Sequence, residues 1–312
     1  MPGTTHDTDR GPGRHSLNLG DGRRSCQAHT RRLVTPNRPR LTCNHIFGRR
    51  QMPYVVNSGV KIHYHVEGEG APLVIQHGLT SSLENWYAYG YVEALKKDYR
   101  LILVDARGHG LSDKPHDPAD YDLELRVSDI LAVMDDVGVD KAHYLGYSMG
   151  GRIGFGLVKH ALGRFHSFAI GGMGAHVANT DTPPETRIGV LRQGIEAYVA
   201  NAEANEGPME AGRKERLLQN DAEALIAATL APMGTESVPE VLPGLNVPFL
   251  IYCGDADGFY PAAKSSAEAI PGCVFVTLPG LNHGEASRSS EPVLPHLTKF
   301  LKEAVGKVAA GA

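Results

Sequence analysis

The sequence predicts an α/β fold, with a mostly parallel central sheet, helices on both faces of the sheet and a small helical lid. Short apolar runs typical of buried strands alternate with segments of helical spacing, before about residue 172 and again after about residue 245. Between these positions only helical spacing occurs, interrupted by Pro-Pro, Gly-Pro and Pro-Gly pairs. The alternation is typical of strand–helix–strand units, and its interruption at about 172–245 indicates an inserted lid.

The composition is that of a globular protein. The chain has 312 residues, of which 42% are hydrophobic and 21% charged, so residues 52–312 suffice for one domain with an insertion. No apolar run is long enough to span a membrane. The four cysteines, at positions 26, 43, 253 and 273, have no zinc or C-x-x-C spacing. They indicate free thiols in a reducing compartment, so we expect a cytoplasmic protein.

The N-terminal segment, residues 1–51, differs from the rest. Its first 50 residues hold ten Arg, three Asp and neither Lys nor Glu, which gives +7 and leaves −11 for the remainder of a chain with net charge −4. Without apolar periodicity, this segment is expected to be disordered. We interpret it as an extension before a natural start at Met52, with a transit peptide as the alternative. The acidic remainder argues against nucleic-acid and anionic-membrane partners.

The first half of the expected domain opens with a hairpin. Two alternating strands, Tyr54–Asn57 and Ile62–Val66, are joined by the turn signal Ser58-Gly59. The further elements expected there are a strand at Leu73–Gln76, a helix from Trp86 to Lys97, a strand at Leu101–Val104 and a helix from Leu123 to Val137.

The second half has short apolar strands on either side of the lid. The expected strands are His143–Leu145, Phe165–Ile170, Phe249–Cys253 and Val274–Leu278, and the expected helices after the lid are Ala262–Ile270 and Val293–Val305. In the lid, apolar residues from Ile188 to Val199 share one helical face, and further helices are expected at Arg213–Gln219 and Ala222–Leu230.

A serine stands at the turn from one of these strands into a helix. Gly146-Tyr147-Ser148-Met149-Gly150 forms a G-x-S-x-G pattern between an apolar run and a helical run. The turn requires an uncommon backbone conformation at Ser148, and the two glycines remove side chains that would obstruct it. We therefore interpret Ser148 as a nucleophile whose hydroxyl stands clear of the sheet.

A serine nucleophile needs a base and an acid that orients the base. Both are expected just after late strands, because ligands of such sheets bind at the carboxyl ends of the strands. His283 follows the last strand in a predicted loop, and Asp257 follows the strand before it. We expect His283 to be the base and Asp257 the acid, with Asp255 as the alternative acid that would otherwise hold its loop.

The oxyanion hole needs two N–H donors. Met149 follows the nucleophile, and Leu79 lies in the loop after the Leu73–Gln76 strand, where His77 is expected to brace the loop. The residues expected to bind substrate are Trp86, Tyr147, Met173 and Phe259, although Trp86 could equally be a core residue. The charged loop Asp105–Ser112 also follows a strand, and we interpret it as structural. No metal or cofactor motif is present, so neither is expected.

Five motifs, HGL, DARGHGLSDKP, GYSMGG, GDAD and LNH, occur in this order between about Tyr54 and Val305. Together they resemble the α/β-hydrolase superfamily. The resemblance implies an α/β-hydrolase fold and a Ser148, Asp257, His283 catalytic triad. The DxRGxGxS loop is similar to that of epoxide hydrolases and haloalkane dehalogenases, but those relatives use an aspartate nucleophile, so Ser148 argues against both activities.

The resemblance implies a serine hydrolase of small to medium carboxylic esters. Enol-lactonase and carbon–carbon bond hydrolase are the alternatives among enzymes, and the partner expected in each case is a small-molecule ester or lactone or a related compound. A non-enzyme alternative is a small-molecule receptor that retains the triad, which slow turnover of every ester would reveal. Fold does not decide among these activities.

Overall fold

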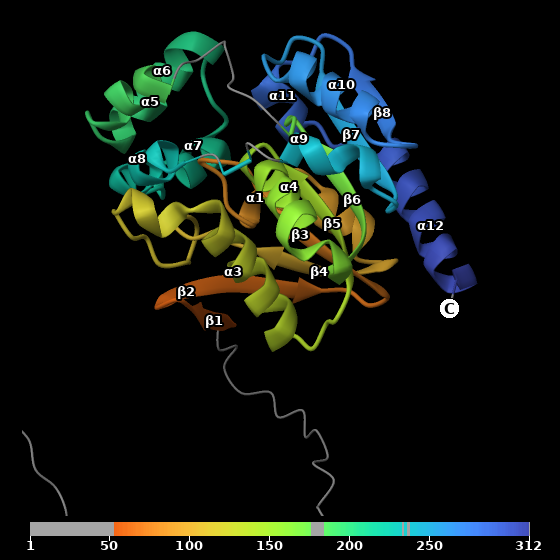
Figure 1. Ribbon diagram of the computed structural model, residues 1–312. Helices are drawn as coiled ribbons and strands as arrows, with labels where there is room; N and C mark the ends of the chain where they lie inside the picture. The colour runs from red at the N-terminus through yellow and green to blue at the C-terminus, as the bar shows by residue number, and fades with distance from the viewer. Residues whose placement is uncertain (1–52, 176–183, 233, 236–237, 312) are drawn as a thin grey trace, which may run out of the picture. The chain divides into compact units, whose positions relative to one another are not determined.

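The computed structural model describes residues 53–175, 184–232, 234–235 and 238–311. An eight-stranded sheet has the order β1-β2-β4-β3-β5-β6-β7-β8 (Figure 1). Only the contacts of β1 with β2 and of β2 with β4 are antiparallel, which confirms the mostly parallel sheet. The strands are β1 Tyr54–Asn57, β2 Val60–Glu67, β3 Ala71–Gln76, β4 Tyr99–Val104, β5 Ala142–Tyr147, β6 Phe165–Gly171, β7 Phe249–Gly254 and β8 Val274–Leu278.

Helices cover both faces of this sheet. Apolar side chains of α3, α4 and α10 pack in one buried cluster with the sheet, and those of α1, α2 and α12 pack in a second cluster on the other face. The helices are α1 Glu84–Ala88, α2 Tyr91–Leu95, α3 Leu123–Asp136, α4 Met149–Ala161, α5 Pro184–Leu191, α6 Ile195–Glu206, α7 Ala211–Leu218, α8 Ala222–Leu230, α9 Val238–Val241, α10 Tyr260–Ala269, α11 His283–Arg288 and α12 Leu294–Gly311.

Two helices expected to be continuous are broken at glycines. The expected helix from Trp86 to Lys97 is two short helices, α1 and α2, separated by Gly90 at φ 81°. The lid face from Ile188 to Val199 is likewise shared by α5 and α6, with Gly194 at φ 101° between them. The positive φ of each glycine ends the helix, although apolar spacing continues across it.

The lid helices α5 to α8 gather beside the carboxyl ends of the strands (Figure 1). Helices α5 and α8 pack through an apolar cluster that includes Leu191 and Leu225. The lid is tied to the loop after β3, because Asn220 Nδ2 donates to the Thr80 carbonyl oxygen at 3.0 Å. The described part of residues 172–245 contains no strand, as expected.

Some expectations lie outside the described residues. These are the disordered extension at residues 1–51 and the free thiols of Cys26 and Cys43. Cys253 and Cys273 are free, as predicted.

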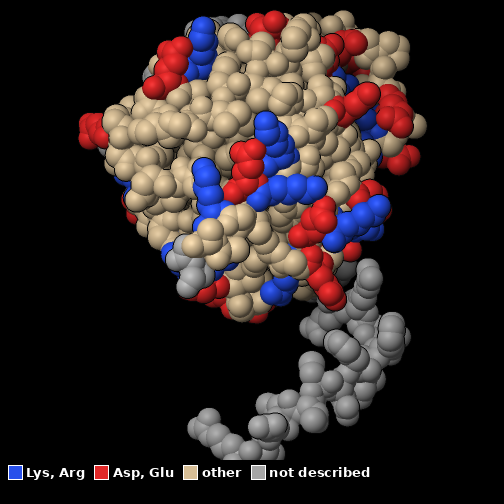
Figure 2. All heavy atoms as spheres, turned by 90° about the vertical axis from the view of Figure 1, so that its right-hand side faces the viewer, with Lys and Arg blue, Asp and Glu red and all other residues tan. Residues whose placement is uncertain are grey.

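Among the described helices, none has the length and apolar character needed to cross a membrane. On the face drawn in Figure 2, basic and acidic side chains are interspersed rather than gathered by sign, so this face offers no basic patch to a phosphate backbone.

The loop Asp105–Ser112 is structural, as predicted. The Arg107 guanidinium makes two hydrogen bonds of 2.7 Å to the Asp129 carboxylate, and both side chains are almost fully buried. The Asp105 carboxylate accepts hydrogen bonds from Leu83 N–H at 2.8 Å and Leu111 N–H at 3.0 Å. These contacts hold the loop against the residues that follow β3.

We expect Arg107→Gln to lower the free energy of unfolding by about 3–5 kcal/mol, because it leaves the buried Asp129 carboxylate without its counter-ion. Urea denaturation at neutral pH measures the effect. The control is Arg164→Gln, which loses an ion pair with Asp135, a side chain that is 66% exposed, and hydrogen bonds to the carbonyl oxygens of Val139 and Asp140, and which should cost clearly less than Arg107→Gln. Equal losses in the two variants would contradict the structural role of Arg107.

Candidate active site

Ser148 lies at the sharp turn between β5 and α4. Its φ of 54° and ψ of −111° are sparsely populated by residues other than glycine. The turn requires close backbone approaches, since a Cβ at Gly150 would lie 2.2 Å from the Gln76 carbonyl oxygen and one at Gly146 would lie 2.4 Å from that of Gly150. Ser148 N–H donates to the Gly171 carbonyl oxygen at 2.8 Å. The local sequence therefore holds the Ser148 hydroxyl at the carboxyl edge of the sheet.

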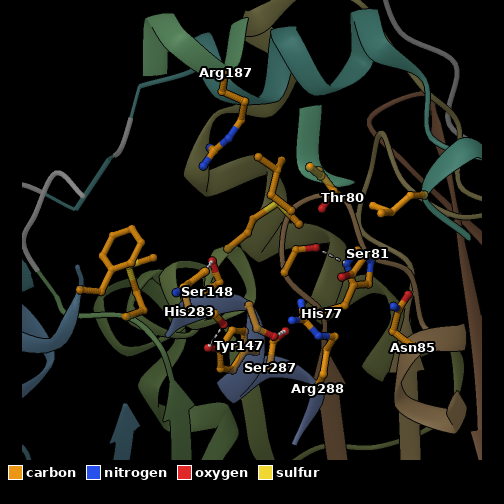
Figure 3. Close-up of a pocket in the computed structure, with 18 of the residues that line it drawn as sticks. His77, Thr80, Ser81, Asn85, Tyr147, Ser148, Arg187, His283, Ser287 and Arg288 are labelled. Carbon is orange, nitrogen blue, oxygen red and sulfur yellow. Dashed lines mark hydrogen bonds between the residues drawn. The ribbon is translucent and has the colours of Figure 1, made fainter. Parts of the chain in front are cut away.

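His283 and Asp257 meet Ser148 from two other strand ends. His283 Nε2 lies 2.8 Å from Ser148 Oγ, and His283 Nδ1 lies 2.7 Å from Asp257 Oδ2 (Figure 3). The Asp257 side chain is fully buried, whereas the His283 side chain is 33% exposed. The structure thus brings the three residues predicted as a triad into one hydrogen-bonded chain, in which the partly exposed His283 links the buried Asp257 to Ser148.

The position of His283 differs from the predicted loop. His283 is the first residue of the short helix α11, which Asn282 and Glu285 begin with a capping box. Asn282 Oδ1 accepts from Glu285 N–H at 3.0 Å, and Glu285 Oε2 accepts from Asn282 N–H at 2.9 Å. The sequence signal was an Asn followed three residues later by a Glu. A helix start fixes the histidine more rigidly than a free loop would.

The two neighbouring aspartates have different surroundings. Asp257 Oδ1 accepts from Phe259 N–H at 2.9 Å, while its Oδ2 faces His283. Asp255 is exposed, and its Oδ1 accepts from Gly280 N–H at 2.6 Å. Asp255 therefore holds the loop after β8, as expected for an aspartate in a turn.

The candidate oxyanion donors belong to two adjacent backbone segments. Met149 begins α4, and Leu79 follows Gly78, at which a Cβ would lie 3.3 Å from Ser148 Cβ. Within the described ranges, neither the Met149 nor the Leu79 N–H has a hydrogen-bond partner. Thr80 has a φ of 65°, an unusual value for a β-branched residue. The segment therefore approaches the serine closely in a strained conformation.

His77 braces this segment, as predicted. His77 Nδ1 lies 2.8 Å from the Gly78 carbonyl oxygen, and its Nε2 accepts from Ala106 N–H at 3.1 Å. Burial lowers the pKa of His77, so the ring is neutral and joins the loops after β3 and β4.

A cavity of about 610 Å³ opens over Ser148 and His283. All four residues predicted to bind substrate line it: Trp86, Tyr147, Met173 and Phe259. Tyr147 OH donates to the His283 carbonyl oxygen at 2.7 Å, and burial followed by the charge of Asp257 raises the pKa of Tyr147. Trp86 is also a core residue, because it is 4% exposed and packs edge-on against Tyr91.

The basic residues of this cavity were not predicted from the sequence. Arg152 lines the cavity one helical turn after Ser148. The residues that surround it in the sequence of α4 are mostly glycine or apolar. A single cation among Ile153, Phe155 and Leu157 was the available signal. In the described part of the chain, no three His, Cys, Asp or Glu side chains are placed to hold a metal ion.

The comparisons with known proteins agree with this geometry. A family model described as alpha/beta hydrolase fold matches residues 71–173. A non-heme haloperoxidase from Rhodococcus erythropolis is 27% identical over 277 residues, which are 80% of this chain and 100% of that protein.

Two solved structures are also similar. The enol-lactonase from Burkholderia xenovorans LB400 has a TM-score of 0.66 at 25% identity, over 81% of this chain and 100% of that one. The esterase RhEst1 from Rhodococcus sp. ECU1013 has a TM-score of 0.65 at 27% identity, over 80% of this chain and 97% of that one. Sheet order, strand-end geometry and these matches show that the chain has the α/β-hydrolase fold and is similar to a haloperoxidase, an enol-lactonase and an esterase.

Proposed function

We propose that this protein is a serine hydrolase that cleaves small to medium carboxylic esters through an acyl-enzyme. The observation that supports this proposal most directly is the hydrogen-bonded chain from Asp257 through His283 to Ser148, at 2.7 Å and 2.8 Å, at the floor of a cavity. This arrangement meets the geometric requirement for an activated serine.

The proposed reaction follows from the positions of these residues. Ser148 Oγ attacks the ester carbonyl carbon while His283 Nε2 takes the hydroxyl proton. The oxyanion that forms is stabilised by the N–H groups of Leu79 and Met149. His283 then gives the proton to the departing alcohol, and water, activated by the same histidine, releases the acid from Ser148. Asp257 keeps the Nδ1 proton in place and stabilises the imidazolium.

The cavity supports a substrate of modest size. Its volume of about 610 Å³ lies within the range of roughly 300–1,000 Å³ typical of small-molecule sites. The similarity to an enol-lactonase favours lactones as the second candidate substrate class, since ring opening of a lactone uses the same steps.

The proposal is tested by covalent labelling together with turnover. A fluorophosphonate should add one phosphonyl group to the peptide that contains Ser148, as measured by mass spectrometry, and should abolish hydrolysis of 4-nitrophenyl esters in parallel. A panel of 4-nitrophenyl esters and aliphatic lactones then ranks the two substrate classes by kcat/KM. Absence of labelling, or slow turnover of every compound, would refute the esterase and support a receptor.

A further inference from the structure

The cavity is strongly basic, although the body of the chain is acidic. Six arginines line it, at positions 126, 152, 187, 213, 216 and 288, and among the lining residues that the structure describes there is no lysine and a single acidic residue, Glu206. The chain beyond its first 50 residues carries a net charge of −11. The positive charge is therefore concentrated around Ser148, where it would attract anions.

Three of the six arginines have hydrogen-bond or ion-pair partners within the protein. Arg126 donates to the carbonyl oxygens of Tyr121 at 2.7 Å and Ala228 at 3.1 Å. Arg213 and Arg288 share Glu206, with N–O distances of 2.7 Å and 3.5 Å. These contacts hold lid and body side chains in place, and they use the one acidic side chain among the described lining residues, so none of these is left for the other three arginines.

The remaining arginines, Arg152, Arg187 and Arg216, have no ion pair with any residue in the part of the chain that the structure describes. Nε of Arg152 and Nε of Arg216 are buried without a hydrogen-bond partner there. Arg216 packs against the Tyr89 ring at 5.8 Å, which offers its charge some compensation. Among the described residues, neither Arg152 nor Arg187 packs against an aromatic ring in this way.

These two arginines come from different parts of the fold, Arg152 from the central helix α4 and Arg187 from the lid helix α5. Arg152 is one helical turn after Ser148, since Arg152 N–H donates to the Ser148 carbonyl oxygen at 2.9 Å. Arg187 comes from α5, and its guanidinium points from the lid into the cavity toward Ser148 and His283 (Figure 3). An anion held between them would be part of the molecule that Ser148 attacks.

The positive charges of these arginines repel one another. Burial, followed by the charge of Arg187, lowers the pKa of Arg152 to about 10. Burial, followed by the charge of Arg152, lowers the pKa of Arg126 to about 9. Arg126 and Arg152 remain cations at neutral pH, since both pKa values lie well above 7, so like charges are held together in the cavity wall at a cost in free energy. A bound anion would remove that cost.

We propose that the acyl part of the substrate carries a carboxylate, which Arg152 and Arg187 bind while Ser148 attacks the ester carbonyl. This inference rests on the proposed function and narrows its substrate class to half-esters and lactones of dicarboxylic acids. Guanidinium groups suit this ligand because their planar N–H donors match the two oxygens of a carboxylate.

The test compares an acidic substrate with a neutral one of nearly the same shape. Half-esters of 4-nitrophenol with succinate, glutarate and adipate are measured against the corresponding 4-nitrophenyl methyl diesters. We expect kcat/KM of the best half-ester to exceed that of its methyl diester by about 10- to 100-fold, the effect of a charge-assisted hydrogen bond. Arg152→Gln and Arg187→Gln should each lower this ratio about ten-fold or more.

Arg192→Gln is the matched control. Arg192 directly follows α5, is exposed and does not line the cavity, so its loss removes the same charge from the lid without changing the ratio. Arg187 is on the lid rather than in the central helix α4, so Arg187→Gln keeps the test decisive even where Arg152→Gln fails to fold.

The outcomes separate this inference from the proposed function. Methyl diesters hydrolysed as efficiently as all three half-esters, or a ratio unchanged in both arginine variants, would overturn the carboxylate assignment and leave the esterase intact. No hydrolysis of any compound would refute the esterase itself. Glutarate should inhibit diester hydrolysis competitively and more strongly than inorganic phosphate, and the reverse order would also overturn the assignment.

Discussion

Ser148→Ala is expected to lower kcat for ester hydrolysis by about 10⁴- to 10⁶-fold, because the members of a triad act as a unit. The variant removes only an oxygen atom that lies 2.8 Å from His283 Nε2. Alanine has the same backbone preferences as serine to a first approximation, so the strained turn at φ 54° costs no more than before. The loss should therefore appear in turnover and not in stability.

Burst and steady-state kinetics with 4-nitrophenyl esters, together with the melting temperature, measure this effect. The matched control is Ser265→Ala, which removes an exposed hydroxyl from α10, away from the cavity. More than a tenth of the wild-type kcat in Ser148→Ala would exclude Ser148 as the nucleophile. A large fall in melting temperature would show that the hydroxyl supports the turn itself.

The parts of the fold that depend on local pattern were predictable. The strand before Ser148 and the helix after it are adjacent in sequence, and Gly146 and Gly150 mark the turn between them. Asp257 and His283 were placed by a general rule, that functional groups gather at the carboxyl ends of parallel strands. Applying this rule requires only the order of the strands along the chain, and the short apolar runs in the sequence indicate that order.

The errors have a common physical cause. At Gly90 and Gly194 the apolar spacing continues although the helix stops, because both helices of each pair pack in the same apolar cluster. Periodicity reports which side chains are buried, and it does not report whether the backbone between them is unbroken. The start of α11 was missed for a different reason, since this short helix has no apolar periodicity and only the capping box at Asn282 marks it.

The basic cavity could not be predicted in the same way. Its arginines come from α3, α4, α5, α7 and α11, which span more than half of the described chain. Each arginine taken alone resembles a solvated surface residue, and only the fold brings them together. Arg152 and Arg187 stay without an ion pair in the described chain because the fold places Glu206 beside Arg213 and Arg288 instead. Substrate selection is thus the property that sequence patterns determine least.

Asp257→Asn is expected to lower kcat by about 10²- to 10⁴-fold, while Asp255→Asn should lower it about ten-fold or less. Two donors converge on the Asp257 carboxylate: His283 Nδ1–H at 2.7 Å and Phe259 N–H at 2.9 Å. An asparagine has one acceptor oxygen, so its NH₂ group must face one of these donors. The conflict is relieved when His283 moves its proton to Nε2, and that tautomer cannot accept the Ser148 proton.

Asp255→Asn has no such conflict. Its Oδ1 accepts a single hydrogen bond, from Gly280 N–H at 2.6 Å, and an amide oxygen can accept the same bond. The two variants remove the same charge two residues apart on one loop, so each is the control for the other. Their kcat values, measured side by side on one ester, decide between the two carboxylates. If Asp255→Asn is the more impaired variant, Asp257 does not orient His283 and the assignment of the acid is wrong.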